Sequence, residues 1–275
     1  MFRKSIYKSP AELRAMRAAG LATAAALAEA RRLLRVGATP LELDAAAERV
    51  ILSHGGRSNF KLEPGYRHAL CVSVGDDVVH GIPGDRAFRP GDIVSVDGGA
   101  EVDGWNGDAA FTVVLPDPSR PEVVAAREEL ARVTEHALWT GVAALAGAKH
   151  LNEVGAAIED AVRAEGDYGI LTDYVGHGIG RSMHEEPPVF NYRVERRSPA
   201  VKPGLVVAIE PMLVAGSIET FVRDDEWTVT TADGADAAHV EHSVAVHDGG
   251  VWVLTAEDGG RAALEPYGVV PVPIA

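Results

Sequence analysis

"DIVSVDGGAEVDGWNGDAAFTVVL", residues 92–115, is the stretch that decides the fold. Two runs rich in β-branched residues meet in it at Asp103-Gly104. Asp-Gly between two such runs is a strong signal for a hairpin with a two-residue turn. With residues 103 and 104 as the turn, residue 102 pairs with 105 and residue 99 pairs with 108. The sequence therefore predicts an antiparallel hairpin here.

Two aspartates of this hairpin, Asp97 and Asp108, share one face if the turn has two residues. Side chains alternate along a strand, so residues 97 and 99 point the same way, and 99 pairs with 108. The two aspartates are then diagonal neighbours, about 7–8 Å apart, and can hold metal ions between them. A turn one residue longer would put them on opposite faces, and water-facing aspartates are the ordinary alternative. The apolar "IVSV" before Asp97 favours burial, and a buried charge needs a partner or a metal.

The rest of the chain predicts two similar halves. Helical periodicity covers residues 10–35 and 121–145. Each is followed by a second amphipathic segment, 37–56 or 147–166, and these two align at an offset of 110. Strand-like runs follow in both halves, at 69–74, 92–104, 109–115, 204–213, 227–231, 239–246 and 250–255. We expect an α+β fold with helices packed on an antiparallel sheet and a site between the halves; chance similarity of two amphipathic helices is the alternative.

The two ends of the chain need separate attention. Ser9-Pro10-Ala11-Glu12 forms a capping box with proline at the first helical position, which predicts a helix start. Residues 18–28, "AAGLATAAALA", resemble the apolar core of a signal peptide, but Arg14, Arg17 and Glu29 interrupt the longer run that follows the capping box and favour an ordinary helix. No apolar run reaches transmembrane length. The last residues, 265–275, are expected to form an extended tail.

Composition limits the classes of function. The 275 residues carry a net charge of −14, which opposes binding to nucleic acid or to an anionic membrane. The single cysteine, Cys71, excludes an intramolecular disulfide and a cysteine-based zinc site, and it fits a reducing compartment.

Two further acids interrupt apolar strand-like runs in the way that Asp97 does: Glu210 in "LVVAIEPML" and Glu241 in "AAHVEHSVAV". Such carboxylates repel one another unless a cation lies between them. Glycine-flanked His80 and His177 could approach a ligand closely, although a lone loop histidine more often makes only hydrogen bonds. The candidate ligands are Asp97, Asp108, His177, Glu210 and Glu241. This oxygen-rich set suits Mn, Fe(II), Co or Zn, and four carboxylates favour two divalent ions that clamp a hydroxide.

These residues occur in an order that resembles the type I methionine aminopeptidases. The matching pieces are "SPAEL" near the start, "VVHGIPGDRAFRPGDIVSVD", "GHGIG", "HEEP", "AIEPM", "WTVTTADG" and "VEHSVAV". The resemblance extends from about Ser9 to Leu254. No single piece is specific, but the ordered set is.

The resemblance implies a pita-bread fold with pseudo-two-fold halves and a dinuclear metal site. Asp108 and Glu241 would bridge two ions, Asp97 would bind one of them, and His177 with Glu210 would bind the other. The activity implied is removal of the initiator methionine from nascent chains, with hydrolysis by hydroxide that the two ions activate. Glu210 would be the general base, and His80 and His184 would contact the substrate amine and the scissile carbonyl.

An apolar pocket for the methionine side chain is implied as well. Its candidates are Tyr66, Cys71, Met183 and Trp227, with Met183 standing where the family often has Phe. Methionine is apolar and adaptable, so the pocket should persist with a changed shape.

The resemblance also sets expectations about organisation and partners. Residues 1–275 would be one catalytic domain, with 256–275 as a C-terminal tail, acting as a cytoplasmic monomer on N-terminal Met peptides near the ribosome. The chain starts directly at the catalytic region, so docking through a zinc-finger or proline-rich extension is not expected. Two alternatives stay open: an X-Pro aminopeptidase or proline dipeptidase, and a non-catalytic binding protein on the same scaffold.

Overall fold

The hairpin expected around Asp103-Gly104 is present. Strands β4 (Ile93–Val102) and β5 (Trp105–Val114) pair so that residue 102 faces 105 and residue 99 faces 108. Asp103 and Gly104 have φ angles of 51° and 76°, the positive values that a type I′ turn requires. The structure is a computed structural model that describes residues 5–195 and 198–275.

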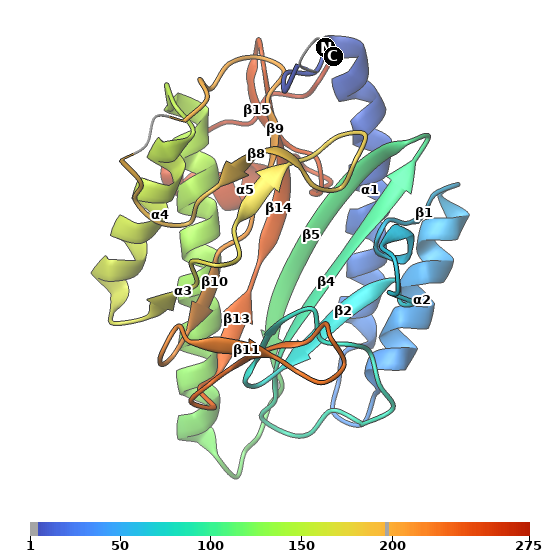
Figure 1. Ribbon diagram of the computed structural model, residues 1–275, viewed down its shortest axis with the longest axis vertical. Coiled ribbons are helices and arrows are strands. Elements are labelled where there is room, and N and C mark those ends of the chain that lie inside the picture. The colour runs from blue at the N-terminus through green and yellow to red at the C-terminus, as the bar shows by residue number, and fades with distance from the viewer. Residues whose placement is uncertain (1–4, 196–197) are drawn as a thin grey trace.

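Most strands belong to one nine-stranded antiparallel sheet that curves through the molecule (Figure 1). The other strands are β1 (Arg57–Ser58), β2 (Leu70–Val74), β3 (Asp77–Val79), β6 (Gly169–Ile170), β7 (Gly176–Gly178), β8 (Glu185–Val189), β9 (Val206–Ile209), β10 (Met212–Val214), β11 (Thr220–Val222), β12 (Val229–Thr231), β13 (Ala237–His239), β14 (Glu241–His247) and β15 (Gly250–Val253). The large sheet has the order β1-β4-β5-β14-β9-β7-β8, with β15 beside β14 and β2 beside β4. Two three-stranded sheets, β13-β10-β6 and β11-β12-β3, lie outside this path.

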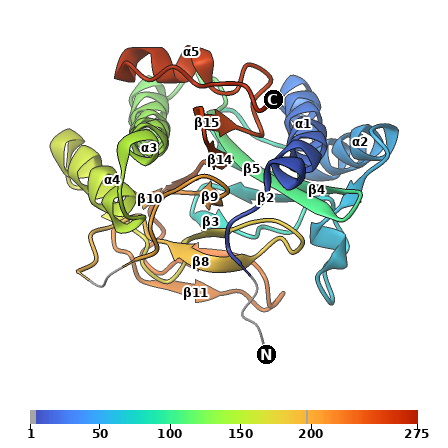
Figure 2. The same ribbon diagram turned by 90° about the horizontal axis from the view of Figure 1, so that it is seen from above.

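Two helix pairs cover one face of the large sheet, one pair on each half (Figure 2). The helices are α1 (Pro10–Leu33), α2 (Pro40–Ser53), α3 (Pro121–Gly147), α4 (Asn152–Glu165) and the short α5 (Arg261–Leu264), with 3-10 turns η1 (Phe60–Leu62) and η2 (Glu265–Tyr267). The helix–helix–strand order of both halves agrees with the sequence expectation. No helix in the described ranges is long and apolar enough to cross a membrane.

Helix α1 begins where the capping box predicts. Ser9 accepts a hydrogen bond from the backbone N–H of Glu12, and the Glu12 carboxylate accepts one from the backbone N–H of Ser9. One face of α1 packs on the hairpin in a buried apolar cluster. Residues 18–28 are thus the middle of a core-packed helix.

The contact between α1 and β5 is unusually close. A Cβ on Gly107 would lie 2.9 Å from the backbone of Ala19 and Gly20, and a Cβ on Gly20 would collide with the carbonyl of Leu254. Thr23 of α1 donates to the carbonyl oxygen of Gly107 at 3.1 Å and accepts from the N–H of Ala100 at 3.1 Å. Helix α1 therefore fixes the hairpin backbone at Gly107, the residue directly before Asp108.

Three expectations about strands and termini were wrong in detail. The run 204–213 is not one strand, because Pro211 lacks an N–H and β9 and β10 enter different sheets on its two sides. The run 239–246 is likewise divided between β13 and β14. The C-terminal segment is not simply extended: residues 261–267 are helical, and Val272 N–H donates to Val251 at 3.0 Å.

Candidate metal centre and substrate cavity

Four carboxylates converge on the face of the sheet opposite to the helices. Ala110 of β5 pairs with Asp97 on one side and with Glu241 on the other, so these acids lie in one row across three strands. Asp108 shares their face two residues along β5. Glu210 directly follows β9, whose last residue pairs with the residue after Glu241. The pair β4 and β5 of the first half and the pair β9 and β14 of the second half thus bring the acids together.

In the part of the chain that the structure describes, no Lys or Arg side chain neutralises these carboxylates. Within residues 5–195 and 198–275, the ion-pair contacts of the four acids are made by Glu210 alone, with His177 and His239. One oxygen each of Asp97, Asp108 and Glu241 is buried without a hydrogen-bond partner. Buried, unpaired carboxylates of this kind are costly in an empty site, which points to a bound cation.

The electrostatics of the acids agree with this. Burial raises the pKa of Asp108 to about 8. Burial and then the charge of Asp108 raise the pKa of Glu210, Asp97 and Glu241 well above their ordinary values. The acids therefore resist ionisation together unless positive charge enters the site.

His177 of β7 adds a nitrogen to this set. Its Nδ1 lies 3.0 Å from the carbonyl oxygen of Gly178, an interaction that places the proton on Nδ1 and leaves the Nε2 lone pair free. Nε2 is 3.4 Å from Oε1 of Glu210. Ligand atoms of Asp108, His177 and Glu241 all lie within 4.8 Å of one another. Burial first, and then His184, lowers the pKa of His177 to about 4, so the imidazole stays neutral, as a metal ligand must.

Oxygen donors with one neutral imidazole match the donor preferences of divalent first-row metals. Among the described residues, the carboxylate oxygens without partners have no neutralising side chain beside them. The residues of the site therefore fit a divalent cation.

Two further histidines, His80 and His184, border the centre. His80 has a φ of 60°, a value uncommon for a residue with a Cβ and one that recurs at functional sites. Its ring lies edge-on to Tyr174 at 5.8 Å. The ring of His184 lies edge-on to His177 at 4.5 Å, and His184 is exposed at the rim. Burial lowers the pKa of His80 to about 4 and also lowers that of His184, so both imidazoles are neutral at pH 7.

An apolar wall faces the carboxylates across a cavity of about 630 Å³. It is a cluster of Phe60, Tyr66, Cys71, Met183 and Trp227. The Tyr66 hydroxyl donates to the carbonyl oxygen of Leu70 at 2.7 Å and lies 3.1 Å from Sγ of Cys71. The rings of Tyr66 and Trp227 are 4.9 Å apart.

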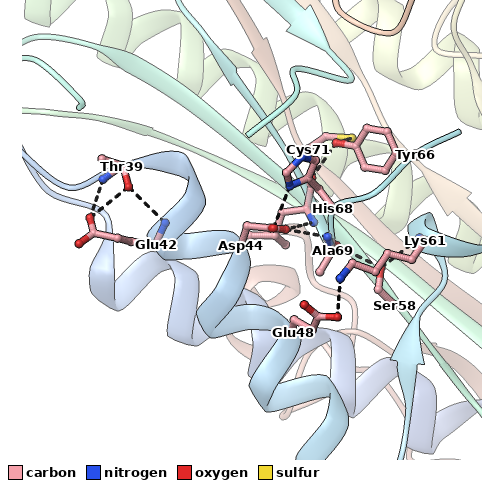
Figure 3. A network of polar contacts seen from close by, with 11 residues as sticks. Thr39, Glu42, Asp44, Glu48, Ser58, Lys61, Tyr66, His68, Ala69 and Cys71 are labelled. Carbon is pink, nitrogen blue, oxygen red and sulfur yellow. Dashed lines mark hydrogen bonds and ion pairs between the residues drawn. The ribbon is translucent and has the colours of Figure 1, made fainter. Parts of the chain in front are cut away.

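Helix α2 fixes the chain that carries this wall. Asp44 of α2 accepts hydrogen bonds from the N–H groups of Ala69 and Leu70, at 2.6 and 3.0 Å, and lies 3.0 Å from Nδ1 of His68 (Figure 3). These bonds anchor the segment that enters β2 at Leu70, one residue before Cys71.

Comparison with known proteins identifies the family. A model described as metallopeptidase family M24 matches residues 14–248. Methionine aminopeptidase 1 of Mycobacterium tuberculosis is 45% identical over 254 residues, which cover 90% of this chain and 94% of that protein. The chain belongs to metallopeptidase family M24.

Solved M24-like structures agree on the fold. A methionine aminopeptidase of Thermotoga maritima, 36% identical, superposes with a TM-score of 0.85 over 94% of this chain and 100% of that chain. A prolidase of Pyrococcus furiosus gives a TM-score of 0.69 over 91% of this chain and 65% of that chain; at 21% identity it bears on the fold alone. The expected pita-bread α+β fold is confirmed.

Every residue that the sequence selected for the site of this M24 peptidase lies on one cavity. The set is Tyr66, Cys71, His80, Asp97, Asp108, His177, Met183, His184, Glu210, Trp227 and Glu241. Their individual roles stay predictions. Sequence reasoning missed His239, which is buried in the cavity wall. Its position two residues before Glu241 was the available signal, because alternation along the expected strand 239–246 would place both side chains on one face.

Proposed function

We propose that this protein is a methionine aminopeptidase that hydrolyses the first peptide bond of chains beginning with methionine. The observation that carries the proposal is the cavity itself, in which a carboxylate–imidazole centre faces an apolar wall. Membership of family M24 and the 45% identical methionine aminopeptidase support it.

Asp97, Asp108, His177, Glu210 and Glu241 would hold the metal. Two divalent ions drawn from Co, Mn, Fe(II) or Zn would best balance the charge of the four carboxylates. When bound, such ions polarise a carbonyl group and acidify water.

The chain's own residues supply positioning and proton transfer. Glu210 would accept the proton released when water attacks the carbonyl carbon and return it to the amine nitrogen when the C–N bond breaks. The neutral imidazole of His184, at the rim, donates an N–H to the oxygen that gains negative charge. His80, which also lines the cavity, would contact the substrate amine. Tyr66, Cys71, Met183 and Trp227 surround the methionine side chain and exclude water from it.

The proposal extends to the setting of the enzyme. One catalytic domain over residues 1–275 would act as a monomer in the cytoplasm, where a buried free thiol such as Cys71 is stable and nascent chains present an N-terminal methionine.

A cleavage assay tests the proposal. After chelation, the protein should cleave Met-Ala-Ser only when Mn, Fe(II), Co or Zn is added back, and Ala-Pro peptides at less than about one-hundredth of that rate, the order of discrimination that a side-chain pocket can supply. Preferential cleavage of Ala-Pro would identify an X-Pro peptidase instead. Absence of metal binding would favour a non-catalytic protein.

A further inference from the structure

His239 is the one histidine of the cavity wall to which the proposed mechanism gives no task. It is the last residue of β13 and is 2% exposed. Its Nε2 is buried and has no hydrogen-bond partner. The nearest charged group is the carboxylate of Glu210, whose Oε2 lies 3.8 Å from that nitrogen. A buried polar nitrogen without a partner calls for an explanation.

The backbone of His239 is fixed by two strands of the other half. Its N–H is shared by the hydroxyl oxygens of Ser95 and Thr112, at 3.1 and 3.2 Å. The Thr112 hydroxyl donates to the carbonyl oxygen of His239 at 2.7 Å, so Ser95 must be the donor in the 2.9 Å bond between the two hydroxyls. The backbone of His239 is therefore held by β4 and β5, the strands that also carry Asp97 and Asp108.

Glu210 lies between two imidazoles. Its Oε1 faces Nε2 of His177 at 3.4 Å, and its Oε2 faces Nε2 of His239 at 3.8 Å. The backbone of Glu210 is held by Asn191, whose Nδ2 donates to its carbonyl oxygen at 3.0 Å. Bringing Oε2 to the roughly 3 Å of a hydrogen bond requires Nε2 and Oε2 to approach by less than about 1 Å.

We propose that His239 is a positioning residue whose Nε2–H donates to Oε2 of Glu210. The bond would hold the carboxylate in place and leave Oε1, which faces Nε2 of His177, available to a metal ion. The inference rests on the proposed metal centre and assigns no direct metal contact to His239. Loss of a hydrogen bond that orients a metal ligand typically weakens metal binding by about 10- to 100-fold.

The test compares His239→Leu and His239→Gln with the parent protein after chelation, using titration calorimetry with Co(II) and the visible spectrum of the Co(II) complex. Leucine removes the donor, and we expect Co(II) to bind about 10- to 100-fold more weakly with an altered spectrum. Glutamine places an amide N–H near the former Nε2 and should restore both. His242→Leu is the matched control: the next histidine of the chain lies on the opposite face of the sheet, with Nδ1 2.8 Å from the Thr255 hydroxyl, and should bind Co(II) like the parent.

The outcomes are distinguishable. A parent protein that binds no Co(II) overturns the proposed function itself. Equal affinity and spectrum for the parent and His239→Leu overturn the role of His239 and leave the function intact. A glutamine variant as weak as the leucine variant, or an equal loss in His242→Leu, also overturns it. If His239→Leu does not fold, His239→Asn replaces it, because the shorter amide cannot reach Oε2.

Discussion

The two halves of the sheet bring their carboxylates together by different means. In the first half, β4 and β5 are continuous ten-residue strands joined by a two-residue turn, and they carry Asp97 and Asp108. In the second half, β9 ends at Ile209, and β14 begins only at Glu241. The chain between them forms β10 to β13 of the two smaller sheets (Figure 1). One half is set by a local turn, whereas the other depends on pairing between distant segments.

The largest effect should come from removing one acid from either half. Asp108→Asn and Glu241→Gln should each lower kcat/KM for a Met-Ala peptide on the order of 10³-fold, because each loses a metal ligand at the centre of the site. Peptide cleavage with metal analysis by mass spectrometry measures this. Asp117→Asn, at a buried aspartate outside the cavity, should keep parental activity. A variant of either half with full metal content and activity would refute the ligand assignment.

Metal binding should depend steeply on pH. The folded-state pKa of Asp108, about 8, exceeds its ordinary 3.8, so between these values the metal-free folded protein binds more protons than the unfolded chain. Its stability therefore falls as pH rises from about 4 to 8. Metal displaces the proton, so affinity should rise about tenfold per pH unit well below the pKa, or about 50-fold in all from pH 6 to 8.

Thermal melts at several pH values, with and without Mn, measure both the fall in stability of the metal-free protein and the stabilisation by metal. In the metal-free state, the Tm of Asp108→Asn should fall less steeply with rising pH than that of the parent protein. A parental Tm that does not change with pH in the absence of metal would contradict the electrostatic description of the site.

The apolar wall combines both halves, with Tyr66 from the first and Trp227 from the second. Trp227→Ala should lower kcat/KM for Met-Ala peptides by roughly 10- to 100-fold, mainly through KM, because it removes side-chain contact that is equal in ground and transition states. Co(II) affinity should not change. Phe221→Ala, at a 52% exposed aromatic residue of the neighbouring β11, should change neither kcat/KM nor Co(II) affinity. Loss of metal in Trp227→Ala would contradict the separation between the apolar wall and the metal ligands.

The smallest effect concerns one glycine in each half. Gly104 and Gly234 have φ angles of 76° and 75°, so alanine at either position should cost roughly 1–2 kcal/mol of unfolding free energy. Nothing lies within 4 Å of a Cβ on Gly234, whereas a Cβ on Gly104 would lie 2.7 Å from Nη1 of Arg181. The larger loss should occur in Gly104→Ala, as measured by denaturant midpoints. A larger loss at Gly234 would show that the first turn is the less constrained one.

The same contrast explains what could be predicted from the sequence. The Asp103-Gly104 turn fixes the register of the first hairpin locally, so the common face of Asp97 and Asp108 followed from alternation alone. Nothing local determines that Ile209 pairs with His242. The break at Pro211, by contrast, had a local signal, because proline cannot donate a hydrogen bond to a neighbouring strand. Glu210 and Glu241 were found as acids in apolar runs, but their convergence was supplied by the family resemblance. His239 was missed because its function depends on a carboxylate that only the fold brings near.

The close contact between Gly20 and Gly107 has a consequence for sequence variation. The two positions are 87 residues apart (107 − 20), but a side chain at either one would have to displace backbone at the other or at Leu254. Because Gly107 precedes Asp108, such a displacement would reach the metal centre from the far side of the sheet. In a library randomised over α1 and selected for peptidase activity, position 20 should therefore return as glycine, while the exposed positions of the same helix should accept many residues.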